Sequence, residues 1–279
     1  MKKILFIALL GCMQYAFAQE KLTPEKLWQI QRVAAIGMSK DKQHIIYSVS
    51  TPDVAANKNN RKKYKVSISG GPAIELANNE ELTINDRVSP DGKFILYSDE
   101  VKINKVAGKE LYPDLPKSDA YVYSSLNYRH WDTWEDGSYN HVFVAPYASG
   151  KSLEGKDIMP NEPYDAPTKP FGGDEDFIWH PDSKHIIYVA KKKYGTDYAV
   201  STNTDLYQYN IETGFTLNLT EGNKGYDLAP QYNQNGVLAW MQMKRDGFEA
   251  DKQDLIILVN DKFPVNLTAH RDESHVEGF

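Results

Sequence analysis

The chain lacks three features that would point to particular classes of protein. It has one cysteine in 279 residues, Cys12, within a segment that we expect to be removed, so the mature chain should hold no disulfide bond. No later segment approaches about 18 uncharged apolar residues, which excludes a transmembrane helix in the mature chain. There is no excess of basic charge either: the net charge is −6, and nucleic acid needs a basic footprint. We therefore expect no nucleic-acid partner, and a fold that depends on its apolar core alone.

The first residues have the pattern of an export signal. Two lysines precede the apolar run 4–10, and Ala16-Phe17-Ala18 has the small-residue spacing of a cleavage site. This pattern predicts a signal peptide over residues 1–18 and a mature protein that is periplasmic or secreted. The alternative is a lipoprotein acylated at Cys12, which we favour less because the site after Ala18 is cleaner.

A tight polar turn followed by a short apolar strand occurs four times, roughly 50 residues apart. The clearest copy is Ser89-Pro90-Asp91-Gly92, which leads into Phe94-Ile95-Leu96-Tyr97, and the other copies begin at Ser39, His180 and Asn233. Each copy is typical of a hairpin that enters a buried strand. A unit that recurs at a fixed spacing predicts a repeat architecture.

Each repeat contains four short strand patterns, A to D, joined in order by turns. Four antiparallel strands per unit are typical of a blade of a β-propeller of the TolB or WD40 type. A β-helix has shorter, parallel coils, and a sandwich would not repeat the turn, so both fit less well. We thus predict an all-β, incomplete propeller over 19–279. The predicted blades are 32–77, 85–160, 175–220 and 228–268, with the start of a fifth at 276–279.

A short helix is expected ahead of the first blade, and a break is expected after the last. Thr23-Pro24-Glu25 supplies an N-cap, a first-turn proline and an early acid, which predicts a helix through about Gln31. Glu277-Gly278-Phe279 matches the beginning of strand A, so we expect the chain to stop inside a blade. A propeller closes with whole blades, and the sequence therefore predicts a truncated propeller.

The connections between strands differ greatly in length. The A–B and C–D turns are short, whereas the B–C connections and one D–A connection are long. In an up-and-down blade these two kinds of connection emerge on the same face, and long loops on a rigid scaffold often bind ligands. The long connections are 51–62, 99–140, 191–204 and 242–253 (B–C) and 156–174 (D–A).

The longest of these connections contains interleaved aromatic and acidic residues. In this stretch Trp131, Asp132 and Trp134 could form a site for a peptide amino terminus, since a carboxylate pairs with an ammonium group and indoles shape a side-chain pocket. The alternative is that the two indoles only fix a long insertion on the propeller. Glu249, in the loop 244–251, is a further candidate substrate contact, although we favour the alternative that this loop is a hairpin tip with internal salt bridges.

Motifs for self-contained catalysis are absent from the sequence. There is no G-x-S-x-G nucleophile motif, no ordered Ser-His-Asp triad and no phosphate-binding glycine loop. His270, Asp272, Glu273 and His275 do not have the spacing of a known zinc motif. We therefore expect no catalytic residue, metal or other cofactor in this chain.

Several loop motifs carry a resemblance to a known family. They are Leu22-Thr23-Pro24-Glu25, Tyr112-Pro113-Asp114-Leu115, Arg129-His130-Trp131-Asp132, Gly155-Lys156-Asp157-Ile158, Pro163-Tyr164-Asp165-Ala166-Pro167, Ser201-Thr202-Asn203-Thr204-Asp205 and Lys244-Arg245-Asp246-Gly247-Phe248-Glu249. Together with the blade turn, which many TolB-like propellers share, they resemble the amino-terminal propeller of exported bacterial dipeptidyl peptidase V-type enzymes of the prolyl oligopeptidase family.

The resemblance implies a partner domain that this sequence does not contain. In that family the propeller covers an α/β-hydrolase domain, which holds the Ser-Asp-His triad. The propeller admits only short peptides and helps to hold their free amino end. The resemblance thus implies a substrate-gating propeller portion of a serine dipeptidyl peptidase, with Trp131, Asp132, Trp134 and Glu249 on the substrate side. Two alternatives stay open: a stand-alone TolB-like propeller that binds proteins or peptides, and a gene fragment without a function of its own.

Overall fold

The computed structural model describes residues 21–77, 85–148, 151–152, 154–260, 262–271 and 274–279. The predicted signal peptide 1–18 lies outside these residues. The chain forms two compact units, Met1–Asn85 and Asp86–Phe279, and each is described by itself. Among the described residues no helix has both the length and the apolar character that a membrane span requires.

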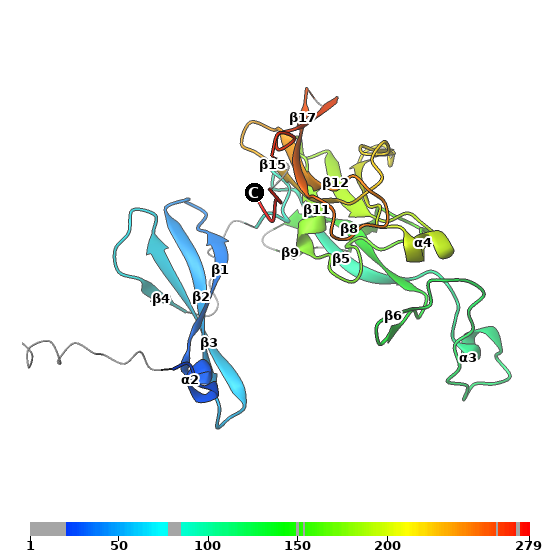
Figure 1. Cartoon of the computed structure of the whole chain (residues 1–279), viewed down its shortest axis with the longest axis horizontal. Coiled ribbons are helices and arrows are strands. Elements are labelled where there is room, and N and C mark those ends of the chain that lie inside the picture. Colours follow the sequence, from blue (N-terminus) through cyan, green and yellow to red (C-terminus); the bar gives the residue numbers. More distant parts are fainter. Residues whose placement is uncertain (1–20, 78–84, 149–150, 153, 261, 272–273) are drawn as a thin grey trace, which may run out of the picture. The chain divides into compact units, whose positions relative to one another are not determined.

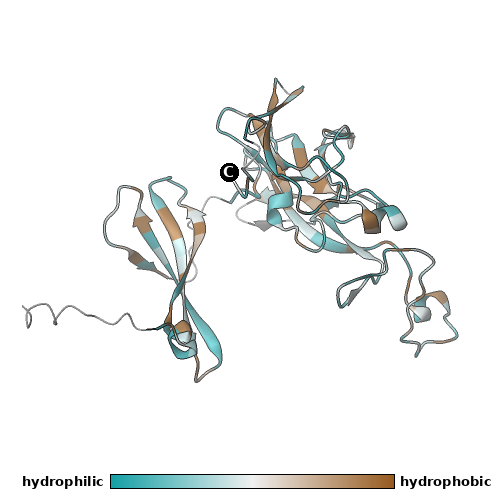
Figure 2. Cartoon of the chain, in the orientation of Figure 1, coloured by the Kyte–Doolittle hydropathy of each residue, from teal (hydrophilic) through white to brown (hydrophobic). Residues whose placement is uncertain are grey.

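The first unit is a short helix followed by one sheet. Helix α2 (Pro24–Gln29) begins as predicted, because the Thr23 side chain accepts a hydrogen bond from the Lys26 N–H at 3.2 Å and proline occupies the first turn. The sheet is antiparallel, and its strands lie in chain order. They are β1 (Arg32–Met38), β2 (His44–Asp53), β3 (Lys58–Ser67) and β4 (Ile74–Leu76). The first part of β3 is hydrophilic (Figure 2).

The second unit holds three further four-stranded sheets (Figure 1). The first of them is β5 (Phe94–Lys102), β8 (Ser138–Ala148) and β10 (Lys156–Asp157), with β9 (Lys151–Ser152) paired to the end of β8. The next is β11 (Phe177–Trp179), β12 (His185–Ala190), β13 (Asp205–Asn210) and β14 (Thr216–Asn218), preceded by the 3-10 turn η2 (Asp174–Asp176). The last is β15 (Asp227–Tyr232), β16 (Leu238–Gln242), β17 (Asp254–Val259) and β18 (Phe263–Asn266).

The predicted fold class is confirmed. The chain is built from four-stranded antiparallel sheets, and in three of them the strands simply follow chain order, as in a propeller blade. Among the described strands, none pairs with a strand of another four-stranded sheet. In the β5–β8–β10 sheet the expected strand A is reduced to one bridge between Val88 and Ile95. The described residues 274–279 form no strand of a further blade, and the Val276 N–H donates instead to the Gln253 carbonyl at 3.0 Å.

The repeated turn has the same backbone geometry in all four sheets. Its fourth residue is left-handed in every copy: φ is 58° at Lys42, 77° at Gly92, 60° at Ser183 and 78° at Gly236. A side-chain oxygen of the first residue accepts a backbone N–H beyond the turn in three copies, for example the Phe94 N–H onto Ser89 Oγ at 3.0 Å. The polar residues of the repeat therefore stabilise the turn itself.

The core explains how neighbouring sheets of the second unit pack. Side chains alternate along β12, so Ile186, Tyr188 and Ala190 pack with the sheet of β5 and β8. Ile187 and Val189 point the other way and pack with the β15–β18 sheet. All five are completely buried. A sheet covered on both faces by its neighbours is the packing expected of a blade.

Candidate functional site

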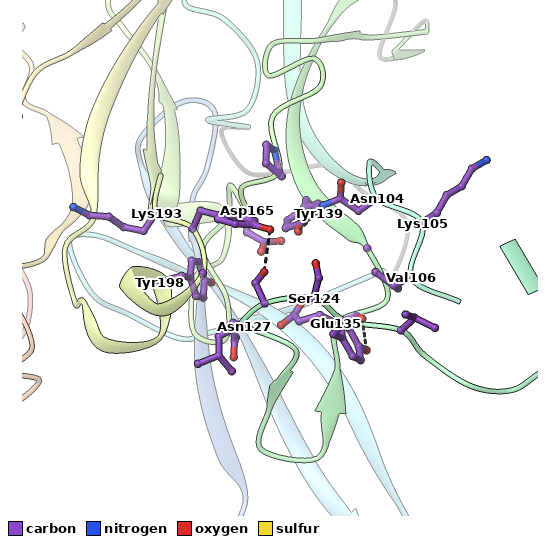
Figure 3. A pocket seen from close by; sticks show the side chains of 18 residues that line it. Asn104, Lys105, Val106, Ser124, Asn127, Glu135, Tyr139, Asp165, Lys193 and Tyr198 are labelled. Carbon is purple, nitrogen blue, oxygen red and sulfur yellow. Dashed lines mark hydrogen bonds between the residues drawn. The ribbon is translucent and has the colours of Figure 1, made fainter. Parts of the chain in front are cut away.

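A cavity of about 340 Å³ lies in the second unit, where three long connections meet (Figure 3). These connections are the β5–β8 insertion, the segment after β10 and the β12–β13 loop. This gathering is what the lengths of the connections lead one to expect. The residues around the cavity are Asn104, Lys105, Val106, Val122, Tyr123, Ser124, Ser125, Leu126, Asn127, Glu135, Gly137, Tyr139, Pro163, Asp165, Lys193, Tyr194, Gly195 and Tyr198.

The insertion between β5 and β8 supplies most of the cavity wall. It contains α3 (Gly108–Leu111) and the small hairpin of β6 (Arg129–His130) and β7 (Thr133–Trp134), which extend away from the sheets (Figure 1). The ring of Tyr123 stacks on that of Trp134 at 6.2 Å, and its hydroxyl donates to the Glu135 carbonyl at 2.7 Å. The aromatic rings thereby hold Glu135 beside the cavity.

Gly137 is the point at which the insertion returns to the sheet. Its carbonyl accepts the N–H groups of Ile103 and Asn104, both at 3.0 Å, and its φ is +87°. A Cβ added there would lie 2.1 Å from the Asn104 carbonyl oxygen. No side chain fits this position without moving the backbone that carries Asn104.

We expect Gly137→Ala to lower the free energy of unfolding by about 2 kcal/mol or more, because a strained φ and a steric clash add. Chemical denaturation measures the loss. The control is Gly214→Ala, which also has a positive φ (+74°) but whose added Cβ would come no closer than 3.8 Å to a neighbour. Equal losses of stability at both positions would mean that the clash with Asn104 does not contribute to the effect.

Two carboxyl groups line the cavity, Glu135 from the insertion and Asp165 from the segment after β10. Burial raises the pKa of both above the ordinary values, more than nearby Lys169 lowers them. Asp165 Oδ1 accepts the Asn140 N–H at 2.8 Å and lies 3.2 Å from Lys169 Nζ. Asp165 is thus fixed in place, and Lys169 partly compensates its negative charge. Glu135 has no cation within salt-bridge distance among the described residues.

Phenol and amide groups complete the polar lining. Burial raises the pKa of Tyr139 and Tyr198, so both hydroxyls stay protonated. Asn104 Nδ2 donates to the Tyr139 hydroxyl at 3.2 Å. The side chains of Lys105 and Lys193 point away from the cavity on opposite sides (Figure 3). The space therefore offers carboxylate and hydroxyl oxygens beside aromatic rings, a setting suited to a cationic group.

None of the four predicted site residues lines this cavity. Trp131 and Asp132 form the exposed turn between β6 and β7, where the Trp131 ring meets that of Phe171 at 5.6 Å. Trp134 is 49% exposed and stacks on the ring of Tyr123. Glu249 is exposed in its own loop. Their role as substrate contacts stays a prediction.

The loop of Glu249 is held largely by its own ion pair. Arg245 donates to Asp251 Oδ1 through Nε at 3.0 Å and Nη2 at 2.8 Å, and the same pair keeps the pKa of Asp251 at about 2. Asp246 Oδ1 accepts the Ser201 hydroxyl at 2.7 Å and the Thr202 N–H at 2.8 Å. These contacts fix the loop after β16 to the loop before β13.

Little in the sequence points to the two acids that line the cavity. Glu135 directly follows Trp134 in the aromatic and acidic stretch, but nothing in the pattern separates it from Asp132. Asp165 belongs to Pro163-Tyr164-Asp165-Ala166-Pro167, one of the motifs that carry the family resemblance. That motif is the one signal that could have identified it.

His180, Asp182 and His185 are the group of possible metal ligands among the described residues, with one donor atom of each within 4.8 Å of the others. Three of the four ring nitrogens of the two histidines already contact other polar groups. His185 Nδ1 lies 2.7 Å from Asp182 Oδ2, and its Nε2 faces Asn210 Nδ2 at 2.9 Å. Asn210 cannot turn over without losing the two N–H groups that its Oδ1 accepts. The three residues therefore fit a turn cap better than a metal site.

We predicted that the residues from His270 to His275 do not form a metal site, and the structure describes two of the four residues concerned. Asp272 and Glu273 lie outside the described residues. The His275 Nδ1 accepts the Gln253 N–H at 3.2 Å, and His270 is exposed. These two imidazoles thus provide no additional indication of a metal.

Comparison with known proteins places the chain beside one group of peptidases. It is 35% identical over 283 residues to dipeptidyl-peptidase 5 of Porphyromonas gingivalis, a match that covers 85% of this chain and 41% of that protein. With dipeptidyl-peptidase 5 of Porphyromonas endodontalis it shares 31% identity over 281 residues, covering 85% of this chain and 40% of that protein. The chain thus spans about two fifths of these relatives.

No family model matches the chain. Among solved structures, TolB from Acinetobacter baumannii superposes with a TM-score of 0.37 and 14% identity, over 85% of this chain and 43% of that one.

Proposed function

The chain is a homologue of the dipeptidyl-peptidase 5 proteins over 85% of its length, and from this relationship we propose that it is the propeller part of an exported serine dipeptidyl peptidase. In this role it limits entry to short peptides and binds their free amino end. The catalytic serine, aspartate and histidine are supplied by an α/β-hydrolase domain, since the sequence has no G-x-S-x-G motif of its own. No cofactor is needed for this chemistry.

The observation that carries the proposal is the pair of carboxyl groups in the cavity. A peptide amino terminus is a compact cation with three N–H donors, and Glu135 and Asp165 offer charged acceptors for it beside protonated phenols. Glu135 lacks a basic partner within salt-bridge distance among the described residues, so an ammonium group would complete its environment. Trp131, Asp132, Trp134 and Glu249 remain predicted contacts for the rest of the peptide.

The test is calorimetric titration of the full chain with alanyl-alanine amide and with its N-acetylated form. We expect the free amine to bind and acetylation to abolish binding, because acetylation removes the positive charge. Glu135→Gln and Asp165→Asn should each weaken binding about tenfold or more, as expected for a lost charge-assisted hydrogen bond. The control is Asp119→Asn, an exposed acid outside the cavity. Equal binding of the two peptides would refute amino-terminus recognition.

A further inference from the structure

One wall of the cavity comes from the connection between β12 and β13. This connection, residues 191–204, contains the short helix α4 (Thr196–Val200). It places Tyr194 and Tyr198 in the lining, and these two residues are called the tyrosine wall below (Tyr198 is labelled in Figure 3). A helix of five residues is not stable by itself, so contacts from outside the helix must fix the wall.

Ser201 is the residue on which these contacts converge. It is buried at the end of α4, where its N–H donates to the Asp197 carbonyl at 3.0 Å and closes the helix. Its own carbonyl accepts a hydrogen bond from Lys191 Nζ. Its hydroxyl donates to Asp246 Oδ1 at 2.7 Å and accepts the Asn203 N–H at 3.1 Å. The end of α4 is therefore fixed by its own loop and by a residue of another sheet.

Asp246 is the residue that comes from the other sheet. It belongs to the loop after β16, and no residue of this loop is among the described lining of the cavity. Its Oδ1 accepts the Thr202 N–H at 2.8 Å in addition to the Ser201 hydroxyl, and the Gly247 N–H donates in return to Thr202 Oγ1 at 2.9 Å. Hydrogen bonds to a carboxylate are stronger than those between neutral groups. The loop after β16 thus holds the end of α4.

The two rings of the tyrosine wall are held by other residues. The ammonium group of Lys191 lies 4.4 Å from the centre of the Tyr198 ring, within the range of a cation–π interaction. In the β5–β8 insertion, the Ser125 hydroxyl donates to the Tyr194 hydroxyl at 2.9 Å. The wall is therefore fixed at its rings by Lys191 and Ser125, and at the end of its helix by Asp246.

We propose that Asp246 is a positioning residue for the tyrosine wall. One of its carboxylate oxygens joins the loop after β16 to the end of α4, so the wall keeps its place only while this oxygen accepts both donors. Asp246 acts through Ser201 and Thr202 and is not itself part of the lining. Two motifs of the sequence, 201–205 and 244–249, thereby have a common role at the cavity. The effect of Asp246 on ligands rests on the proposed function.

The first test needs no ligand. Hydrogen exchange of the full chain reports on the Ser201 amide, which closes α4, and on the Leu206 amide, which donates to Thr220 Oγ1 in the adjoining sheet. In Asp246→Ala we expect the protection factor of Ser201 to fall about tenfold and that of Leu206 to change by less than about threefold, because the loss is local. An unchanged Ser201 amide, or an equal loss at both amides, would overturn the proposal.

Two further variants test whether the acceptor oxygen is the cause. Asp246→Asn keeps an oxygen that can accept both donors, so the protection of Ser201 should stay within about threefold of that in the unchanged chain. Glu221→Ala, at an exposed acid outside the cavity, should behave like the unchanged chain. If Asp246→Asn lost as much protection as Asp246→Ala, the acceptor would not be the cause and the proposal would be wrong.

Titration with alanyl-alanine amide connects this role to the cavity. Asp246→Ala should bind the peptide about tenfold more weakly than the unchanged chain, but in a chain that already carries Tyr198→Ala it should cost less than about threefold, because the ring that Asp246 positions is gone. Equal losses with and without Tyr198 would show that Asp246 does not act through the wall. If exchange behaves as expected but the unchanged chain binds no peptide, the positioning role stands and amino-terminus recognition falls.

Discussion

Replacing Asp227 by alanine is expected to lower the free energy of unfolding of the second unit by about 3 kcal/mol at pH 5. The side chain is completely buried at the start of β15 and accepts three N–H groups. They come from Trp240 Nε1 at 2.6 Å, Gln242 Nε2 at 2.7 Å and Asn223 Nδ2 at 3.0 Å. Alanine would leave all three donors without this acceptor, and the indole of Trp240 is only 2% exposed. Urea denaturation followed by tryptophan fluorescence measures the loss.

The same substitution should have a characteristic pH dependence. Burial raises the pKa of Asp227 to about 7, more than its donors lower it. A carboxyl group whose pKa is higher in the folded chain stabilises it fully below the ordinary value of 3.8, and this contribution is lost as the pH rises through about 7. The unchanged chain therefore loses stability over this window, and the deficit of Asp227→Ala shrinks.

Asp119→Ala, at an exposed acid, is the control and should change stability by less than about 0.5 kcal/mol at any pH. A deficit of Asp227→Ala that grew from pH 5 to 7 would mean that the three donors outweigh burial.

The blade turns could be predicted because their cause is local. A left-handed residue at the fourth position and a side-chain acceptor at the first are properties of a few adjacent residues, and Ser89 and Gly92 meet both requirements in the sequence itself. The strands that follow then alternate between two faces, and full burial of β12 on both faces agrees with its run of β-branched and aromatic residues.

The cavity could not be predicted in the same way. Its acids are 30 positions apart, and they meet only because the β5–β8 insertion and the segment 157–167 both return to β8. A two-residue turn at Trp131 and Asp132 decides which side chains of the hairpin face solvent. The sequence shows that aromatic and acidic residues alternate there, but not that Glu135 is the one held beside the cavity. The long-range return of the chain, not local propensity, determines which acids line the cavity.

Strand A is missing from the β5–β8–β10 sheet, and Arg87 links this part of the chain to the next sheet. With a single bridge at Val88, the backbone there offers few ladder hydrogen bonds, and a side chain links this region to the next sheet instead. Arg87 Nη1 donates to the carbonyl oxygens of Asp174 at 2.7 Å and Phe177 at 2.6 Å. Its guanidinium lies 4.6 Å from the centre of the Phe177 ring, and its own carbonyl accepts the Trp179 indole N–H at 2.7 Å.

Arg87→Ala should therefore lower the free energy of unfolding by about 3 kcal/mol, since it leaves the carbonyl groups of Asp174 in η2 and Phe177 in β11 without this donor and removes a cation from a buried ring. Arg87→Lys should recover about half of the loss, because an ammonium keeps the charge but cannot reproduce the planar donor geometry. Arg271→Ala is the matched control, at an exposed arginine. Urea denaturation of the four proteins provides the comparison. If Arg87→Ala and Arg271→Ala were equally stable, the packing of Phe177 and Trp179 alone would hold the two sheets together, and the side-chain link would be dispensable.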